Sequence, residues 1–148
     1  LYNTLAEMEK PDFAAIRERI GDRLSGKAWE EEMRRCYRQG AEEVIALEKK
    51  AGKNNPDGLL RRLRARGRRW EGGGDRPSPA PTPAEISRVL EEMGAAKVPA
   101  DVGIPRQYVY DSIRYGKELR DRYTILQLMW DIDRLEEEAG RLVEKYCG

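Results

Sequence analysis

The sequence predicts an all-α fold, a bundle of about six helices that forms a single domain over residues 1–148. Apolar residues recur at intervals of three and four along nearly the whole chain, and no stretch shows the alternation that a half-buried strand needs. The length of 148 residues, of which 37% are charged and 39% hydrophobic, suits one domain rather than two.

Start and stop signals divide the first half of the chain into three helices. The predicted helices span 13–24, 26–51 and 56–70. Asp12 is placed to cap the first and Ser25 to cap the second. Asn55 is placed to cap the third, and Pro56 occupies the first helical position, which proline favours. We expect the second helix to continue without a break to Gly52, because its apolar period does not change.

A loop and a fourth helix follow. Residues 72–83 hold three glycines and four prolines, a composition that predicts a flexible surface loop. Thr82, Pro83 and Glu85 then form a proline-containing capping box. The helix that follows ends near Gly94, and its apolar face consists of Ile86, Val89, Leu90 and Met93.

The last third of the chain predicts two more helices. After a short connector comes a helix whose inward residues include Val109 and Ile113. Thr124 and Gln127 repeat the capping-box pattern, and apolar residues then follow at alternating spacings of 3 and 4. The sequence therefore predicts one continuous helix over 124–146. Its core-facing residues are expected to be Leu128, Ile132, Leu135 and Leu142.

The composition argues against catalysis by this segment alone. Histidine, the commonest general base and transition-metal ligand, is absent. Cys36 and Cys147 are too far apart for a metal-binding pair, and we expect both to be reduced thiols. Glycines 72–74 follow no strand and precede no Lys-Ser or Lys-Thr pair, so they do not form a phosphate loop. We therefore expect no catalytic, cofactor-binding or metal-binding residue and no cofactor in this segment.

Three sets of side chains are expected to be structural or solvated. The acids near the end of the chain lack a histidine partner and are expected to be solvated: Asp131, Asp133, Glu136, Glu137 and Glu138. The tyrosines are expected to bond neighbours or face an interface: Tyr108, Tyr110, Tyr115 and Tyr123. The tryptophans are expected to pack in the core: Trp29, Trp70 and Trp130.

A dense group of arginines lies in the third predicted helix. Its members are Arg61, Arg62, Arg64, Arg66, Arg68 and Arg69. Such a group can contact phosphates, and the Trp70 that follows it can stack on bases. However, the arginines run around most of the helix, so a solvated helix with snorkelling side-chain stems explains them better. The net charge of +1 also argues against attraction of a polyanion by the whole surface.

The sequence indicates a cytoplasmic protein without a membrane partner. Its longest apolar stretches are only a few residues, whereas a bilayer-spanning helix needs roughly 20. No amino-terminal signal sequence is recognisable.

The most specific motif lies between residues 102 and 128. It contains VGIPR at 102–106, IRYGKE at 113–118 and LRDRYTILQL at 119–128. These runs resemble the carboxy-terminal part of the sn-glycerol-1-phosphate dehydrogenases, in which an Arg-Asp-Arg-Tyr-Thr-(Ile/Val)-Leu-Asp-Leu run opens the last helix. Gln127 stands where that family often has aspartate. We expect the turn to organise its neighbours through a cap or an ion pair made by Arg120, Asp121, Arg122, Tyr123 or Thr124.

The resemblance implies the helical carboxy-terminal domain of a larger oxidoreductase of phospholipid metabolism. Enzymes of this family reduce dihydroxyacetone phosphate with NADH or NADPH at a divalent metal such as zinc, nickel or iron. Their nucleotide-binding domain and metal ligands lie upstream of the segment that this chain resembles. The implied partner is therefore the amino-terminal nucleotide-binding domain of the same enzyme, and a homo-oligomer is left open.

Two alternatives remain at this point. One is a non-catalytic helical module that binds other proteins through the predicted 124–146 helix. The other, which the arginine pattern favours less, is a nucleic-acid binder that uses the Arg61–Arg69 helix.

Overall fold

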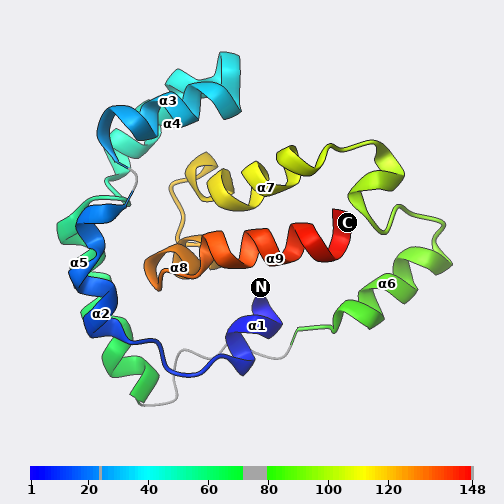
Figure 1. Ribbon diagram of the computed structural model, residues 1–148, viewed down its shortest axis with the longest axis horizontal. Helices are drawn as coiled ribbons and strands as arrows, with labels where there is room; N and C mark the ends of the chain where they lie inside the picture. Colours follow the sequence, from blue (N-terminus) through cyan, green and yellow to red (C-terminus); the bar gives the residue numbers. More distant parts are fainter. Residues whose placement is uncertain (24, 72–79, 148) are drawn as a thin grey trace.

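The structure is a computed structural model that describes residues 1–23, 25–71 and 80–147 (Figure 1). Most of these residues are helical, and none of the described residues belongs to a strand. The all-α prediction is therefore confirmed. Two of the predicted helices are each split in two, and residues Tyr2–Glu7 form a helix that was not predicted, so the described part of the chain contains more α-helical segments than expected.

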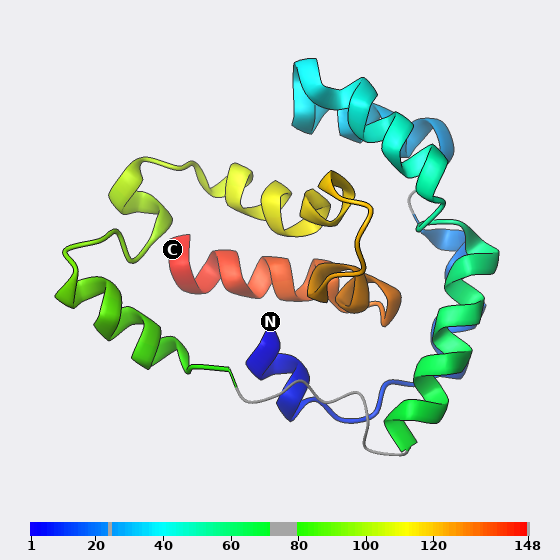
Figure 2. The same ribbon diagram turned by 180° about the vertical axis from the view of Figure 1, so that it is seen from behind.

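The helices form an open ring around a central helix. The α-helices are α1 (Tyr2–Glu7), α2 (Phe13–Glu18), α3 (Gly26–Tyr37), α4 (Ala41–Ala51), α5 (Pro56–Glu71), α6 (Pro83–Glu92), α7 (Arg106–Tyr115), α8 (Ile125–Asp131) and α9 (Leu135–Cys147). Short 3-10 turns between them are η1 (Ile20–Asp22), η2 (Arg38–Gly40), η3 (Pro99–Val102) and η4 (Gly116–Leu119). Figures 1 and 2 show α9 in the middle of the molecule. α7 packs along α9, α2 packs against α5, and α3 and α4 form a helical hairpin at one end of the ring.

Side-chain caps begin several helices where the sequence predicts them. Asp12 accepts hydrogen bonds from two backbone N–H groups of α2, each at 3.0 Å. Asn55 accepts one from an N–H of α5 at 2.9 Å. Thr82 and Glu85 form the predicted capping box before α6. Ser25 precedes α3 without a side-chain bond to it, so this predicted cap is absent.

The first predicted helix is shorter than 13–24. α2 ends at Glu18 and η1 follows, while Leu24 lies outside the described residues. The chain leaves the helix near Gly21, a residue of low helix propensity. This exit places the guanidinium of Arg23 against two backbone carbonyl oxygens at the end of α8.

The helix predicted over 26–51 is two helices. α3 ends just before Arg38, which has φ 49° and ψ −114°, a conformation that is unfavourable for an L-residue. The chain then folds back, and α4 packs against α3 around Met33 and Val44. Periodicity missed the turn because both helices carry an apolar stripe, and because the residue with positive φ is an arginine rather than the nearby Gly40.

The helix predicted over 124–146 is also divided. α8 ends at Asp131, and Asp133 has a φ of 60°, so the chain bends before α9 begins at Leu135. Aspartate is one of the few non-glycine residues that enter this region readily, and the apolar spacing carries no sign of the bend. The bend brings the Asp133 carboxylate to 2.7 Å from the guanidinium of Arg19.

Three of the four residues predicted to face the core from this region are buried. The exposed fractions of Leu128, Ile132 and Leu135 are 7%, 1% and 1%. Leu142 is only half-buried, and Val143 is buried in its place. This difference follows from the bend, because the buried face of α9 does not continue the helical phase of α8.

The apolar core consists of two clusters. The larger joins α1, α2, α5, α8 and the start of α9, and its buried members are Leu5, Phe13, Ile16, Leu59, Leu63, Leu128, Met129, Ile132 and Leu135. The smaller joins α3, α4 and α7 through Trp29, Met33, Val44, Ile45 and Tyr115. Trp70 lies against the larger cluster, with its ring edge-to-face on Phe13 at a centroid distance of 6.3 Å.

The apolar face of α6 is exposed, whereas an amphipathic helix normally packs this face against a neighbour. The exposed fractions of Ile86, Val89 and Met93 are 49%, 48% and 73%. Figure 1 shows α6 at the rim of the ring. The surface loop predicted over 72–83 stays a prediction for residues 72–79, which lie outside the described residues.

We predict that Arg38→Gly stabilises the protein. Glycine has no Cβ to clash in this backbone conformation, so the free energy of unfolding should rise by about 1 kcal/mol. The variant also loses the exposed hydrogen bond from Arg38 to the Tyr108 hydroxyl, and Arg38→Ala loses that bond without relief of the backbone. Urea unfolding of both variants measures the difference. An Arg38→Gly midpoint no higher than that of Arg38→Ala would contradict the prediction.

Ile132→Ala should lower the free energy of unfolding by about 2–5 kcal/mol, because its side chain is fully enclosed and truncation leaves a cavity. Leu142→Ala removes a half-buried side chain from the same region and serves as the matched control. Thermal and urea unfolding should show the smaller loss for Leu142→Ala. Equal losses would mean that the two positions are packed alike.

Candidate functional site

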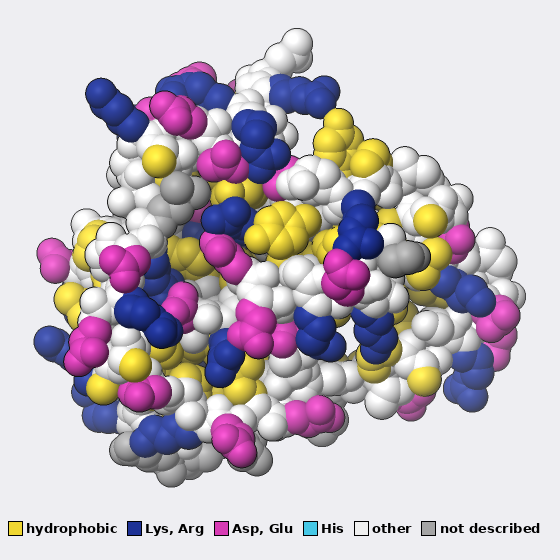
Figure 3. Space-filling view, in the orientation of Figure 1, with side chains coloured by type: hydrophobic (Ala, Val, Ile, Leu, Met, Phe, Trp, Pro, Cys, Tyr) yellow, Lys and Arg dark blue, Asp and Glu magenta, His cyan; other side chains and the backbone are white. Residues whose placement is uncertain are grey.

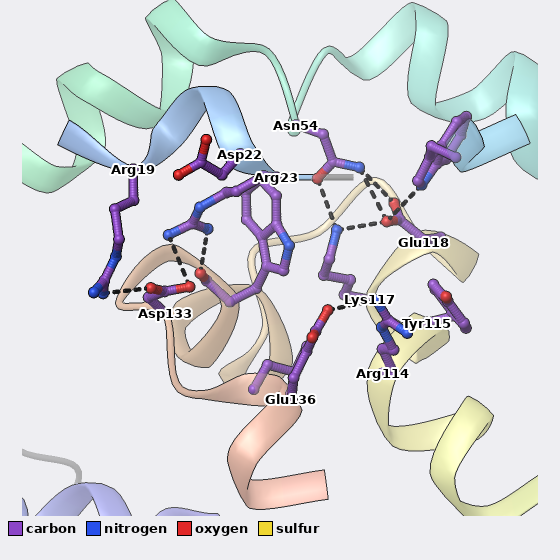
Figure 4. Close-up of a pocket in the computed structure, with 13 residues that line it drawn as sticks. Arg19, Asp22, Arg23, Asn54, Arg114, Tyr115, Lys117, Glu118, Asp133 and Glu136 are labelled. Atoms are coloured by element: carbon purple, nitrogen blue, oxygen red, sulfur yellow. Dashed lines mark hydrogen bonds and ion pairs between the residues drawn. The ribbon is translucent and has the colours of Figure 1, made fainter. Parts of the chain in front are cut away.

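A hollow of about 420 Å³ lies between the α2–α5 side of the ring and the α7–α9 side (Figure 4). Its walls come from five regions of the chain that the turns bring together. The lining residues are Arg19, Asp22, Arg23, Trp29, Asn54, Arg114, Tyr115, Lys117, Glu118, Trp130, Asp133, Leu135 and Glu136. The short turns η1 and η4 and the bend between α8 and α9 supply most of the charged side chains.

A buried ion pair forms one wall of the hollow. Lys117 and Glu118 are 3% and 1% exposed, and the ammonium donates a hydrogen bond to the carboxylate. Asn54 joins both groups: its amide oxygen accepts from Lys117 Nζ at 2.7 Å, and its Nδ2 donates to Glu118 at 3.0 Å. The indole N–H of Trp29 also donates to Glu118, at 3.3 Å. Burial lowers the pKa of Lys117, and the adjacent carboxylate opposes that shift.

Trp130 lies between two cations in the centre of the hollow. The guanidinium carbon of Arg23 is 4.4 Å from the ring centroid, and Lys117 Nζ is 4.3 Å from it. Such cation–π contacts are stronger where water is excluded. Trp130 packs against the larger apolar cluster as predicted, and it is half-buried.

Each cation that lines the hollow has a carboxylate partner. Arg19 and Arg23 approach Asp133 at 2.7 and 3.8 Å, and Arg114 pairs with Glu136. With the buried Lys117–Glu118 pair, the charges of the lining nearly balance. The hollow therefore has little surplus charge with which to attract an ionic ligand.

A second buried network lies behind the hollow, around Asp131. This carboxylate is 0% exposed and accepts hydrogen bonds from Arg62 at 2.6 and 2.9 Å. The Tyr123 hydroxyl donates to it at 2.8 Å, and Gln127 Nε2 donates at 3.1 Å. The expectation that Asp131 is solvated is wrong, as is that expectation for Arg62, because the two side chains neutralise each other inside the fold.

The other acids of this region lie in different places. Asp133 is at the mouth of the hollow, and Glu136 and Glu137 are exposed and paired with Arg114 and Arg134. Glu138 is buried to 8% exposure, against the expectation that it is solvated, because Arg141 and Thr4 cover it.

The motif at 120–124 contributes through its last two residues. Thr124 accepts a hydrogen bond from the backbone N–H of Gln127 at 3.3 Å and so caps α8. The side chain of Gln127 turns to Asp131 instead of returning to Thr124, so the predicted capping box is incomplete. Tyr123 binds Asp131 through its hydroxyl.

The first three residues of the motif, Arg120, Asp121 and Arg122, are exposed. Their side chains make no hydrogen bond or ion pair with the described part of the chain. The Arg120 contribution is its backbone carbonyl oxygen, which accepts a hydrogen bond from Lys53.

The structure does not bring the six arginines of α5 to one site. Arg62 turns inward to Asp131, and the guanidinium of Arg66 lies 4.9 Å from the Tyr123 ring centroid. The remaining four are exposed: Arg61, Arg64, Arg68 and Arg69.

The four clustered tyrosines also separate. Tyr115 is buried and donates a hydrogen bond to Glu32 at 2.9 Å, and Tyr108 is exposed and accepts one from Arg38 at 3.0 Å. Tyr110 is half-buried and Tyr123 is exposed.

The described ranges contain no group of three or more His, Cys, Asp or Glu side chains placed to hold a metal ion. Cys36 and Cys147 are half-buried free thiols. No described helix is both long and apolar enough to cross a bilayer.

Asp131→Asn should lower the free energy of unfolding by about 3 kcal/mol, because it leaves the Arg62 guanidinium in the interior without its counter-charge. Asp133→Asn is the matched control, since it breaks ion pairs in which the carboxylate side chain is 40% exposed, and we expect a loss below about 1 kcal/mol. Urea unfolding measures both. Equal losses of unfolding free energy in the two variants would show that the buried pair contributes no more to stability than the exposed one.

Thr124→Ala should cost about 1 kcal/mol through loss of the α8 cap. Arg122→Ala, two residues earlier, should change the stability by less than about 0.5 kcal/mol, because its side chain is exposed and unpaired within the described residues. Melting temperatures in parallel samples compare the two variants. The prediction fails if Arg122→Ala is the more damaging.

Comparisons of the chain with models of protein families, with curated proteins and with solved structures find no match. The function of the chain is therefore argued from its own residues and contacts.

Proposed function

We propose that the chain is the helical carboxy-terminal part of an sn-glycerol-1-phosphate dehydrogenase-like oxidoreductase, and that it supports the active site without supplying reacting groups. The observation that carries the proposal is the position of the run at 119–128, on which the resemblance rests. Its Tyr123 and Gln127 bind the buried Asp131, Thr124 caps α8, and Leu128 is in the core. The run on which the resemblance rests therefore helps to organise the fold.

A supporting role agrees with the state of the charged groups. The buried Lys117 and Glu118 bind each other, and Asp131 is fully occupied by its donors. A general base or nucleophile needs a group that is free to reach a substrate. In the proposed enzyme these pairs instead fix the positions of α5, η4 and α8.

The cofactors of the proposed enzyme are assigned to its other part. The described residues do not fit a divalent metal, since they offer neither histidine nor a cluster of ligating side chains. They also contain no strand–glycine–helix turn for a dinucleotide. NAD(P) and the metal would therefore be held by the amino-terminal nucleotide-binding domain, and no chemical step is assigned to this chain.

The exposed face of α6 supports a partner within the same enzyme. Ile86, Val89 and Met93 form an apolar stripe of which about half or more is exposed. A ten-residue helix is marginal in water without tertiary packing. We propose that this stripe packs against the nucleotide-binding domain.

The second candidate is a non-catalytic module that binds other proteins through the last helix. The geometry favours it less, because α9 lies in the middle of the ring and buries Leu135, Ala139 and Val143. The surface left for such a module would be α6.

The proposal is tested on the full-length protein encoded by the surrounding reading frame. Metal-loaded full-length protein should consume NADH or NADPH when dihydroxyacetone phosphate is added, and the present chain alone should not. Calorimetric titration of the present chain with zinc and nickel should show no tight stoichiometric binding. A folded, metal-loaded full-length protein that consumes neither cofactor with this substrate would refute the proposal and leave the interaction module.

A further inference from the structure

Cationic side chains from two segments line an open hollow at the edge formed by α2 and α5. The hollow has a volume of about 580 Å³, and its cations are Lys10, Arg17, Arg64 and Arg68. One carboxylate, Asp12, is also in the wall, but two backbone N–H groups of α2 already bind it. Figure 3 shows Lys and Arg side chains on the left of the view, with Asp and Glu side chains among them. The hollow therefore carries a local positive charge although the whole chain is nearly neutral.

The arginines of this edge make no ion pair with the described part of the chain, whereas several arginines elsewhere do. Arg19, Arg34 and Arg106, for example, each pair with a carboxylate. No described residue forms a hydrogen bond or ion pair with the side chains at the edge, which are Arg17, Arg61, Arg64, Arg68 and Arg69. The charge of these arginines is therefore not neutralised by described side chains and is open to an anionic ligand.

Three arginines of α5 form a row whose length is similar to that of a run of successive phosphates. Arg61, Arg64 and Arg68 lie at positions i, i+3 and i+7 and so share one face of the helix. At 1.5 Å per residue the row covers about 10 Å along the axis. Four successive phosphates of one strand cover a similar length, about 10 Å of the axis of a duplex. The planar guanidinium also matches the geometry of a phosphate better than an ammonium does.

We propose that Arg17, Arg64 and Arg68, with Arg61 one turn earlier, form a surface that binds the phosphate backbone of nucleic acid. We expect the binding to read no bases, because Trp70 is half-buried and its ring packs edge-to-face on Phe13. A membrane is a poorer fit. None of the exposed large apolar side chains in the described part of the chain lies on α2 or α5, so none is available to insert beside the charges. The proposal does not depend on the function proposed above.

The test measures binding of the whole chain to a fluorescein-labelled 20-nucleotide DNA, single-stranded and as a duplex, by fluorescence anisotropy. With three to four phosphate contacts, the affinity for duplex should fall roughly 40- to 150-fold between 50 and 200 mM salt. Two oligonucleotides of equal length and unrelated sequence should bind alike.

Double variants distinguish binding at this surface from attraction by the net charge of the protein. The double variant Arg64→Ala with Arg68→Ala should weaken binding at 50 mM salt at least tenfold. The slope of log affinity against log salt should also fall by the amount expected for about two phosphate contacts. Arg34→Ala with Arg134→Ala removes the same charge from two exposed, ion-paired sites and should change the affinity less than twofold. Arg64→Lys with Arg68→Lys should retain most of the salt dependence. Circular dichroism and melting temperature confirm that each variant is folded.

Four results would overturn the proposal. The first is no binding to either DNA at 50 mM salt. The second is an equal loss in the control pair, which would assign binding to net charge. The third is displacement of the DNA by a few millimolar inorganic phosphate, which would indicate a small-anion site. The fourth is retention on phosphatidylserine vesicles, with the same dependence on Arg64 and Arg68, in the absence of binding to DNA.

Discussion

The arrangement of the helices depends on the buried ion pair between Arg62 and Asp131. A carboxylate without contact with water is unfavourable unless its oxygens accept hydrogen bonds from the protein. Here the donors are a guanidinium, a hydroxyl and an amide. These donors come from α5, from the turn before α8 and from α8 itself. A single relative placement of the three elements supplies all of the donors at once, so the ion pair selects that placement more sharply than apolar contacts would.

A polar layer joins the two apolar clusters. Lys117, Glu118 and Asn54 lie between the α3–α4 hairpin and the rest of the fold, and Lys53 binds two backbone carbonyl oxygens of the chain after α7. The layer is not fully satisfied. Oε2 of Glu48 is buried without a hydrogen bond to the described residues, and burial raises the pKa of this carboxyl group. Such a layer is suited to holding elements in fixed positions, which is the role proposed for the chain.

The sequence allowed the helices to be predicted more accurately than the breaks and contacts between them. Caps at Asp12, Asn55 and Thr82 are local signals, and three residues of the predicted apolar stripe are buried. The breaks at Arg38 and Asp133 were missed because neither is a glycine or a proline. The Asp131 network was missed because Arg62 is 69 residues away in sequence, and no periodic pattern links two such charges. One local sign was present: Gln127 and Asp131 are one helical turn apart inside an otherwise apolar run.

The division of the core has a consequence for local opening. The hairpin of α3 and α4 packs around Met33 and Ile45, and Tyr115 of α7 is the one buried member of this cluster from outside the hairpin. Its links to Glu118 of η4 are polar, and water can replace polar contacts at less cost than buried apolar ones. We therefore expect the amides of the hairpin to open together in native-state hydrogen exchange, at a lower free energy than those of α5 and α8.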